Sequence, residues 1–501
     1  MNMVQKKVIV IGAGIAGLAT GCYLQMNGYD TQIFEMGKLP GGLCTSWKRK
    51  DYIFDGCLYW VVGSNPANSF HKFWQELGVI KDLKYIEFDE ILRIEDENGK
   101  ELVLYSDPDK LEDEMMKLSP EDKNLINELI GVIKNTPFNK MPIDKAPELY
   151  TFIDGIKVMF KIIAAIKFLK KWDMPLKAYA TKYKNPFLRS MLSKIFGDVY
   201  DFPTSSLLAM LTWMRKESGY PIGGSMAFSK AIEKRYFELG GKINYNSKVI
   251  KIITEDNKAT GIKLEDNSIY NAEIIISAAD GHYTIFEMLE GKYVNKEITD
   301  IYKNFTPYPA IMHVSLGIDT GFDNISQVLN FPLEKTIVID DKNSLERLNI
   351  KINNFDPTLV PKGKTSVITY FRADDEYWVN LKKENPEKYK DEKERIALKI
   401  IEALDKRFPG ISSKIEVFDV ATPATYIRYT GNWKGSHQGW IPDAKSFMTR
   451  IKNTLPGLKN FYMVGQWTQA GGGVPTGAMT ARNITQVICK KDNKKFNTTI
   501  A

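Results

Sequence analysis

The chain has 501 residues, which is too long for one compact hydrophobic core, so we expect two or more domains. Hydrophobic residues make up 44% and charged residues 26%, which excludes a largely disordered or fibrous chain, and we expect disorder only in the tail from about Lys490 onward. The net charge of +7 is mild, and no basic stripe carries interleaved aromatic residues, so a nucleic-acid partner is not expected.

The cysteines and histidines limit the chemistry further. None of the four cysteines forms a CxxC pair, and no two of the four histidines have metal-ligand spacing, so we expect neither a disulfide framework nor a metal site. Cys57 is not expected to act as a redox thiol, since no partner thiol is near it in the sequence. No signal peptide is recognised before the first strand and no apolar run reaches 18 residues, so we expect a cytoplasmic protein without a spanning helix.

The first elements follow the order of a dinucleotide-binding unit. Residues 8–11 (VIVI) are typical of a parallel strand buried on both faces. The glycine-rich loop 12–17 (GAGIAG) follows, then a predicted helix over 18–27 that ends at Gly28. A second strand is predicted over 31–34.

The residues of this loop have separate mechanical roles. Gly12 permits a tight turn, Gly14 lets the backbone approach a pyrophosphate, and Gly17 lets the helix pack close to the strand. Ala16 lies in the same loop, where the helix N-terminus turns free N–H groups and the positive end of its dipole toward the phosphates. Glu35, after the second strand, is placed to bond a ribose hydroxyl and disfavours a 2′-phosphate, so NADP is not expected here.

A second glycine pair comes six residues after Glu35. Gly41 and Gly42 suit another close approach of backbone to an extended cofactor, although an ordinary surface turn would also use them. Leu43 follows the pair directly.

The middle of the chain has weaker signals. Strand-like runs occur at 311–318, 365–371 and 415–420, whereas the stretch before residue 219 is mostly helical by pattern. The segment 152–172 places lysines on one face and aliphatic residues on another and ends in Trp172, which fits both an interfacial membrane helix and an ordinary surface helix.

The C-terminal region favours FAD over NAD. A predicted strand over 461–464 leads into Gly465 and Gln466, and a second glycine cluster ends at Gly473 and Val474 before a predicted helix over 476–489. Glycine backbone followed by a helix N-terminus suits the N1–C2=O edge of a flavin, which is anionic when reduced.

Three stretches together resemble the phytoene desaturase-like flavoproteins, a group with carotenoid desaturases, carotenoid isomerases and retinol saturases, within the amine-oxidase-type superfamily. They are residues 8–63, 219–281 and 416–489. The resemblance implies that the strand near Val249 contacts the adenine through its backbone, and that 54–60, with Tyr59, reaches the flavin region. Tyr59 and Trp60 would line a substrate site or belong to the core, and core is the simpler expectation.

The same resemblance covers other positions. Thr422 to Thr425 look like part of the family's substrate-side strand and loop. Many relatives have Arg where this chain has Leu43, and carotenoid isomerases and retinol saturases also tend to lack it, which disfavours an amine oxidase. Lys48 or Arg49 could replace the missing cation.

We therefore expect an α/β fold: a discontinuous Rossmann-like FAD-binding domain (1–90, 220–290 and 440–501) and an α+β substrate domain with a mixed sheet (91–219 and 291–439). The function that the resemblance implies is FAD-dependent desaturation, saturation or isomerisation of an apolar isoprenoid, carotenoid- or retinoid-like lipid, with peripheral contact at the inner face of the membrane. An amine oxidase producing hydrogen peroxide and a flavin protein without catalysis are the alternatives. Substrate, electron acceptor and oligomeric state stay open.

Overall fold

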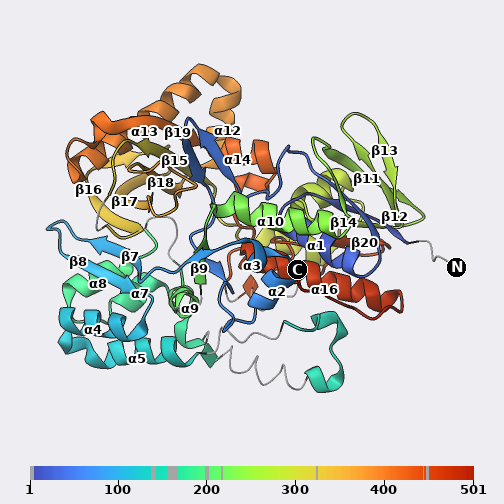
Figure 1. Ribbon diagram of the computed structural model, residues 1–501, viewed down its shortest axis with the longest axis horizontal. Helices are drawn as coiled ribbons and strands as arrows, with labels where there is room; N and C mark the ends of the chain where they lie inside the picture. The colour runs from blue at the N-terminus through green and yellow to red at the C-terminus, as the bar shows by residue number, and fades with distance from the viewer. Residues whose placement is uncertain are drawn as a thin grey trace.

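The computed structural model describes residues 5–136, 143–155, 167–168, 170–197, 202–215, 218–322, 325–443, 445–446, 449 and 451–501. Figure 1 shows a parallel sheet with its helices on one side of the molecule and a larger mixed sheet on the other. A group of short helices lies below the mixed sheet in that view.

The parallel sheet has five strands in the order β10-β2-β1-β14-β20, and every neighbouring pair is parallel. The strands are β1 (Lys7–Ile11), β2 (Asp30–Phe34), β10 (Lys242–Asn244), β14 (Ile274–Ser277) and β20 (Phe461–Met463). They come from three distant stretches of the chain, each of which lies within the segments expected for the FAD-binding domain. The central position of β1 explains its continuous apolar sequence, because both of its faces are covered.

Alternate side chains of β1 enter two separate cores. Val8 and Val10 pack with the helices on one face, and Ile9 and Ile11 pack with a small antiparallel sheet on the other. The helices are α1 (Ile15–Met26), α10 (Gly224–Glu238) and α16 (Gly473–Lys491), and the small sheet is β11 (Val249–Glu255), β12 (Lys258–Leu264) and β13 (Ile269–Asn271).

The mixed sheet has seven strands in the order β19-β15-β18-β17-β16-β7-β8, and only the β16–β7 pair is parallel. Its strands are β7 (Glu90–Glu95), β8 (Glu101–Tyr105), β15 (Ile311–Ile318), β16 (Val328–Val338), β17 (Ser344–Asn353), β18 (Thr365–Arg372) and β19 (Ile415–Ala421). One face packs on α12 (Asp375–Glu384) and α13 (Pro386–Arg407) in a single apolar core. The opposite face forms part of the wall of a cavity.

The remaining elements fill the space between and below the two sheets. The helices packed on β7 and β8 are α4 (Pro108–Leu118), α5 (Lys123–Asn135), α7 (Leu176–Ala180), α8 (Pro186–Ser193) and α9 (Thr204–Met214). The others are α2 (His71–Glu76), α3 (Val79–Asp82), α11 (Lys296–Asn304), α14 (Pro423–Thr430), β3 (Ser46–Arg49), β4 (Tyr52–Asp55), β5 (Val61–Val62), β6 (Tyr85–Ile86) and β9 (Ser218–Pro221).

The predicted elements lie close to these bounds; α16 begins at Gly473 rather than at residue 476, and three further differences have a physical reason. The helix α1 begins at Ile15 rather than at residue 18, because the second half of the glycine loop is already helical after the N-cap Gly14. Thr422 to Thr425 do not continue a strand: β19 ends at Ala421 and Thr422 caps the helix α14 through a capping box.

The third difference is the tail, for which the expectation of disorder is wrong. The backbone N–H of Asn497 donates to the side-chain oxygen of Asn27 (2.8 Å), and the ammonium of Lys494 lies 4.0 Å from the centre of the Tyr29 ring. These polar residues are ordered because they close the C-terminal end of α1, a role that composition alone does not show.

The proposed membrane-facing segment 152–172 lies partly outside the described residues, which here are 152–155, 167–168 and 170–172. Its faces are therefore not described. Among the described residues, no helix combines the length and apolar character that crossing a lipid bilayer requires.

Gly17 is the position where the fold tolerates a side chain least. A Cβ built there would lie 1.9 Å from the backbone oxygen of Gly12, whereas one on Gly131 in α5 would meet no atom within 4 Å. We expect Gly17→Ala to destabilise the protein by about 3 kcal/mol or to prevent folding, because backbone cannot move away. The control Gly131→Ala should stabilise it by about 0.5–1 kcal/mol. Thermal unfolding checks both, and an unchanged Tm for Gly17→Ala would contradict this packing.

Candidate functional site

A single large cavity runs from the parallel sheet to the mixed sheet. Its volume of about 1770 Å³ exceeds the roughly 300–1,000 Å³ of an ordinary small-molecule pocket. Its lining comes from the glycine loops at one end and from the mixed sheet and the helix α9 at the other. The space is therefore sufficient for a dinucleotide and a second ligand beside it.

The first glycine loop forms the cofactor end of the cavity. Gly12, Gly14 and Ala16 line it, whereas Gly17 does not and instead packs on the backbone of Gly12, as its predicted role requires. The N-cap of α1 has no side-chain hydrogen bond, and the first turn has no acidic residue. The helix N-terminus is thus open to an anion such as a pyrophosphate.

Glu35 lies at the end of β2 and lines the same part of the cavity. One carboxylate oxygen accepts from the backbone N–H of Ala13 and the other from that of Gly37, both at 2.7 Å. Burial raises the pKa of Glu35, and the two backbone hydrogen bonds oppose that shift. Each oxygen keeps a second lone pair, so the carboxylate can also accept from a ribose hydroxyl.

The second glycine pair packs directly on the first loop. The N–H of Gly41 donates to the oxygen of Ala13 (2.8 Å), and both Gly41 and Gly42 have positive φ angles, +108° and +61°. Both glycines and Leu43 line the cavity, so this pair is not an ordinary surface turn.

No cation replaces the missing arginine in the way the sequence suggested. Lys48 and Arg49 are exposed on β3, and the guanidinium of Arg49 pairs with Asp419 at 2.9 Å. Neither side chain lines the cavity, so the expectation of a substitute cation at these two positions is wrong.

The C-terminal glycines close the cavity from the other side. Gly465 and Gln466, after β20, and Gly473 and Val474, at the start of α16, all line it. This helix also lacks a side-chain cap and has no acidic residue in its first turn. Two uncapped helix N-termini, of α1 and α16, therefore face one cavity, and this arrangement fits a ligand with a pyrophosphate and a second electron-rich edge.

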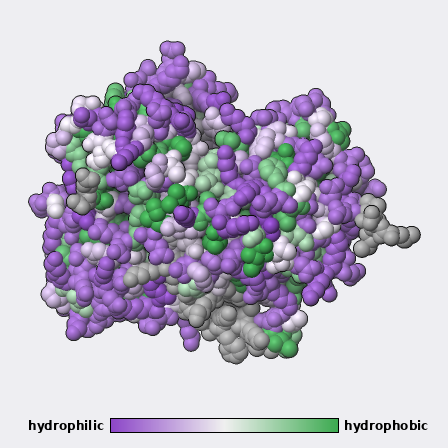
Figure 2. Space-filling model, in the orientation of Figure 1, coloured by the Kyte–Doolittle hydropathy of each residue, from purple (hydrophilic) through white to green (hydrophobic). Residues whose placement is uncertain are grey.

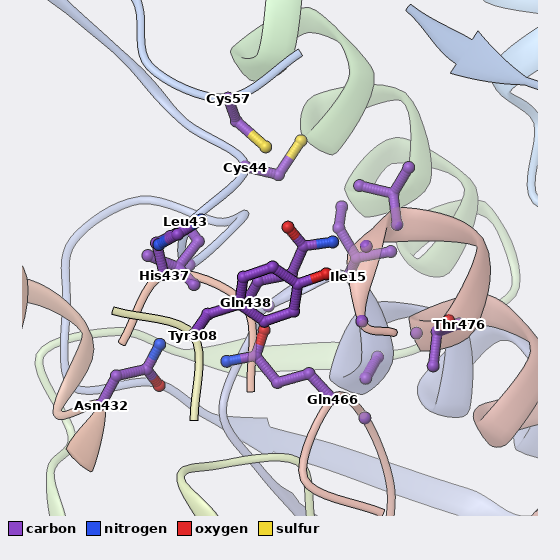
Figure 3. A pocket seen from close by; sticks show the side chains of 18 of the residues that line it. Ile15, Leu43, Cys44, Cys57, Tyr308, Asn432, His437, Gln438, Gln466 and Thr476 are labelled. Atoms are coloured by element: carbon purple, nitrogen blue, oxygen red, sulfur yellow. The ribbon is translucent and has the colours of Figure 1, made fainter. Parts of the chain in front are cut away.

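Other side chains complete this end of the cavity. Figure 3 shows Leu43, Tyr308, His437, Gln438 and Gln466 gathered around one part of the pocket. The amide of Gln438 donates to the oxygen of Gly471 (2.9 Å), which braces the glycine cluster. The sequence carried no signal for Tyr308 or Gln438, because both come from loops of the mixed-sheet region. Val249, expected near the adenine, also lines the cavity, at the start of β11.

The far end of the cavity is aromatic and apolar. Tyr59 and Trp60 line the cavity where this apolar part begins and also pack against the hydrophobic clusters, so they belong both to the cavity wall and to the core. Together with them stand Phe168, Ile195, Phe196, Phe202, Met210 and Trp213.

Asp55 has a structural role. It is fully buried, accepts from the hydroxyl of Tyr220 (2.6 Å) and the N–H of Ser225 (3.0 Å), and pairs with Lys351 (3.4 Å). Its carboxylate is therefore not free to serve as an acid or a base.

The structure corrects the view that Cys57 has no partner. Figure 3 shows the sulfur atoms of Cys57 and Cys44 pointing toward each other, while the Cys44 thiol donates to the backbone oxygen of Ser225 (3.6 Å). Burial raises the pKa of Cys44 well above its usual range, and the contact with Cys57 adds to that shift. Both thiols are free, and the neutral form of Cys44 is favoured, which makes it a poor nucleophile.

Within the described residues, no group of three or more His, Cys, Asp or Glu side chains is placed to hold a metal ion.

Comparisons with known proteins agree with this geometry. A family model described as flavin containing amine oxidoreductase matches residues 15–489. The chloroplastic prolycopene isomerase of Arabidopsis thaliana is 26% identical over 93% of this chain and 80% of its own, and the neurosporene-forming phytoene desaturase of Rhodobacter capsulatus is 24% identical over 96% and 94%. An oxidoreductase from Methanosarcina mazei superposes with a TM-score of 0.60 at 18% identity, over 96% of this chain and all of that one.

Glu35 provides a direct test of the cofactor end. In Glu35→Gln one of the two backbone N–H groups that the carboxylate accepts from would face an NH₂ group. We expect the Kd for FAD to rise by about 10- to 100-fold, since the neutral amide loses the charge-assisted hydrogen bond that the carboxylate would accept from a ribose hydroxyl, worth about 1.5–3 kcal/mol. Titration of the flavin-free protein with FAD, followed by fluorescence, measures this. Glu384→Gln, on an exposed residue of α12, is the control. Equal affinities in both variants would show that Glu35 does not support the cofactor.

Proposed function

The chain belongs to the flavin containing amine oxidoreductase family, and on that premise we propose that this FAD-dependent oxidoreductase acts on carbon–carbon double bonds of a long, apolar, isoprenoid-type lipid. The observation that carries the proposal is the continuation of the cavity beyond its cofactor end into a chamber lined by aromatic and aliphatic side chains. Relatives named prolycopene isomerase and phytoene desaturase support it.

The division of the cavity suits such a reaction. Bound FAD supplies a hydride donor or acceptor at its N5 atom. The protein's part is to hold the reacting carbon against the cofactor and to exclude water. Tyr59 and Trp60 come from the loop after β4, next to the cofactor end, and Trp213 lies on α9 at the far end. Together they line a hydrophobic path along which an extended chain can lie.

The amine oxidase alternative has less support in this cavity. A protonated amine needs an acceptor or a carboxylate near the reacting position. Of the carboxylates that line the cavity, Asp55 lies on the same segment as Tyr59 and Trp60, and it is occupied by Lys351 and by the hydroxyl of Tyr220. Binding an amine there would require breaking a buried ion pair.

The proposed function is tested with the FAD-loaded protein and a panel of polyenes. We expect at least one polyene to be desaturated, saturated or isomerised by the oxidised or the reduced enzyme under anaerobic conditions, as followed by absorption and chromatography. A panel of amines should yield no hydrogen peroxide. Peroxide production from an amine, with no change in any polyene, would reverse the assignment.

A variant pair locates the substrate within the cavity. Ala209 on α9 lines the apolar end, so Ala209→Trp should abolish turnover of long polyenes without changing the FAD content. Ala178→Trp, on the exposed side of α7, is the matched control and should be active. Full activity of Ala209→Trp would place the substrate elsewhere.

We also propose that the protein makes reversible contact with membranes, because its substrate would partition into lipid. Phe152 and Ile153 are 85% and 64% exposed and adjacent in the chain, so they present two large apolar side chains together to solvent. They belong to the segment at the lower edge of Figure 1, where Figure 2 shows a small hydrophobic patch.

Sedimentation with anionic liposomes at low salt checks this contact. Replacing Phe152 and Ile153 together with Ser should reduce the bound fraction several-fold, because the exposed apolar area is lost. Ile269→Ser, at a 58% exposed site on β13, is the control and should bind as before. Equal sedimentation of all three proteins would exclude this segment as the contact.

A further inference from the structure

Two of the four cysteines lie side by side on the wall of the cavity. Cys44 and Cys57 both line it, whereas Cys22 and Cys489 are fully buried elsewhere in the core. Cys44 lies at the end of the second glycine loop of the cofactor end, and Cys57 lies in the loop after β4 that leads to the apolar end. The two thiols therefore stand where the cofactor end of the cavity meets its substrate end.

The pairing of β3 with β4 explains why these two residues meet. In this antiparallel pair Ser46 lies opposite Asp55 at the end of the two strands. The backbone N–H of Gly56 makes a hydrogen bond of 3.1 Å across to the segment before β3, so the register continues for one pair beyond the strands. The next pair in the same register is Cys44 and Cys57.

Residues that lie directly opposite each other in an antiparallel pair have the spacing that a disulfide needs. Their Cα atoms are about 4.5–5.5 Å apart, and disulfides join Cα atoms that are about 4.4–6.8 Å apart. Two residues farther along the same face, the hydroxyl of Ser46 donates to the carboxylate of Asp55 at 3.3 Å, so side chains on this face do meet across the pair. The sulfur atoms of Cys44 and Cys57 already point toward each other (Figure 3). Closing a bond between them therefore needs side-chain rotation rather than a rearranged backbone.

The surroundings of the pair suit both oxidation states. The thiol of Cys44 donates to the backbone oxygen of Ser225 at 3.6 Å, and because a thiol is a weak donor, losing this bond on oxidation costs little. A disulfide has no donor that would need a partner in a buried place. Cys44 is 3% exposed and Cys57 is half-buried, so Cys57 is the thiol that reacts first and Cys44 is shielded until its neighbour has reacted.

We propose that Cys44 and Cys57 form a reversible disulfide that exchanges two electrons with the FAD bound in the same cavity, so that the protein has a second redox centre beside its cofactor. When the disulfide forms, both S–H bonds break and one S–S bond forms. Two electrons and one proton pass to oxidised FAD, and the second proton is released to water. The reverse reaction takes up that proton and returns both electrons from reduced FAD to the sulfur atoms. The exchange depends on the FAD cofactor and not on the identity of the lipid substrate.

A second centre bears on how the reaction is supplied with electrons. Saturation of a double bond withdraws two electrons from reduced FAD, and desaturation delivers two electrons to oxidised FAD. The dithiol can supply the first reaction, and the disulfide can accept from the second, while the cavity stays occupied by the substrate. The fully reduced protein then holds two electrons on FAD and two more on the thiols.

The first measurement asks whether the bond forms. Flavin-free protein with all four thiols reduced is treated with oxidised glutathione, and the free thiols are counted after denaturation. We expect the count to fall from four to two, and mass spectrometry of the digested protein should find the peptides of Cys44 and Cys57 joined.

The second measurement asks whether the pair exchanges electrons with FAD. Two anaerobic preparations contain the same number of electrons: one combines the dithiol protein with oxidised FAD, and the other combines the disulfide protein with chemically reduced FAD. Both are followed by flavin absorption and by the number of free thiols. We expect them to converge on one flavin spectrum and one thiol count, because electrons that can move between the two centres reach the same equilibrium from either side. A rate that does not depend on protein concentration shows that the exchange occurs within one molecule.

Two variants and one control assign the exchange to this pair. Cys44→Ser and Cys57→Ser each remove one of the two sulfur atoms, so oxidised FAD added to either reduced variant should stay oxidised, and the thiol count should not change. The control is Cys489→Ala, at a buried cysteine that does not line the cavity, and it should form the disulfide and converge as the wild type does. FAD content and Tm verify that each variant is folded, and the two serine variants, in separate loops, provide independent readings.

Three results would overturn the inference. One is a wild type that keeps all four thiols free or joins cysteines other than Cys44 and Cys57. Another is a disulfide that forms but leaves the two preparations different, because the sulfur pair would then have no redox contact with FAD. The third is convergence that survives in both serine variants. Polyene turnover is measured separately, so a failure of the disulfide leaves the proposed function standing.

Discussion

The buried ion pair between Asp55 and Lys351 is the contact on which the arrangement of the site depends. It joins a loop of the cofactor end to the mixed sheet, and both side chains are fully buried. Removing two charges from water is costly, and burial lowers the pKa of Lys351. The cost is offset by the hydroxyl of Tyr220 and the N–H of Ser225 on the carboxylate, and by the oxygen of Leu58 on the ammonium. Three separate stretches of chain, around residues 55–58, 220–225 and 351, are thereby held at one point between the two sheets.

The two ends of the cavity are built from different materials as a consequence. At the cofactor end the wall is mostly backbone. Glycines at 12, 14, 41 and 42 allow a ligand to come close to the chain, and the N-termini of α1 and α16 face the cavity without a side-chain cap. At the substrate end the wall consists of side chains. The strands that carry them pack their other face into an apolar core. Substitutions in the substrate wall can therefore leave the residues of the cofactor end unchanged.

The substrate wall also has a mixed character that separates it from a plain apolar tunnel. Aromatic and aliphatic side chains such as Phe196 and Trp213 stand beside the polar row of His313, Tyr370 and Asn349. Tyr59 joins the two regions, because it lies against Tyr370 with ring centres 6.0 Å apart and under the ammonium of Lys351 at 4.9 Å. The wall thus combines aromatic and aliphatic surface with residues of the mixed sheet.

The sequence by itself determined the cofactor end, because that end depends on local order: a strand, glycines at required spacings, a helix and an acid lie within 30 residues of each other. It also indicated the strands at 311–318, 365–371 and 415–420. Only the tertiary structure decided the rest. His313, Tyr370 and Asn349 meet through the register of strands far apart in the chain, Cys44 meets Cys57 through loop packing, and the tail is ordered by contacts with α1. Such contacts leave no periodic or regularly spaced pattern in the sequence, because long-range packing determines which residues meet.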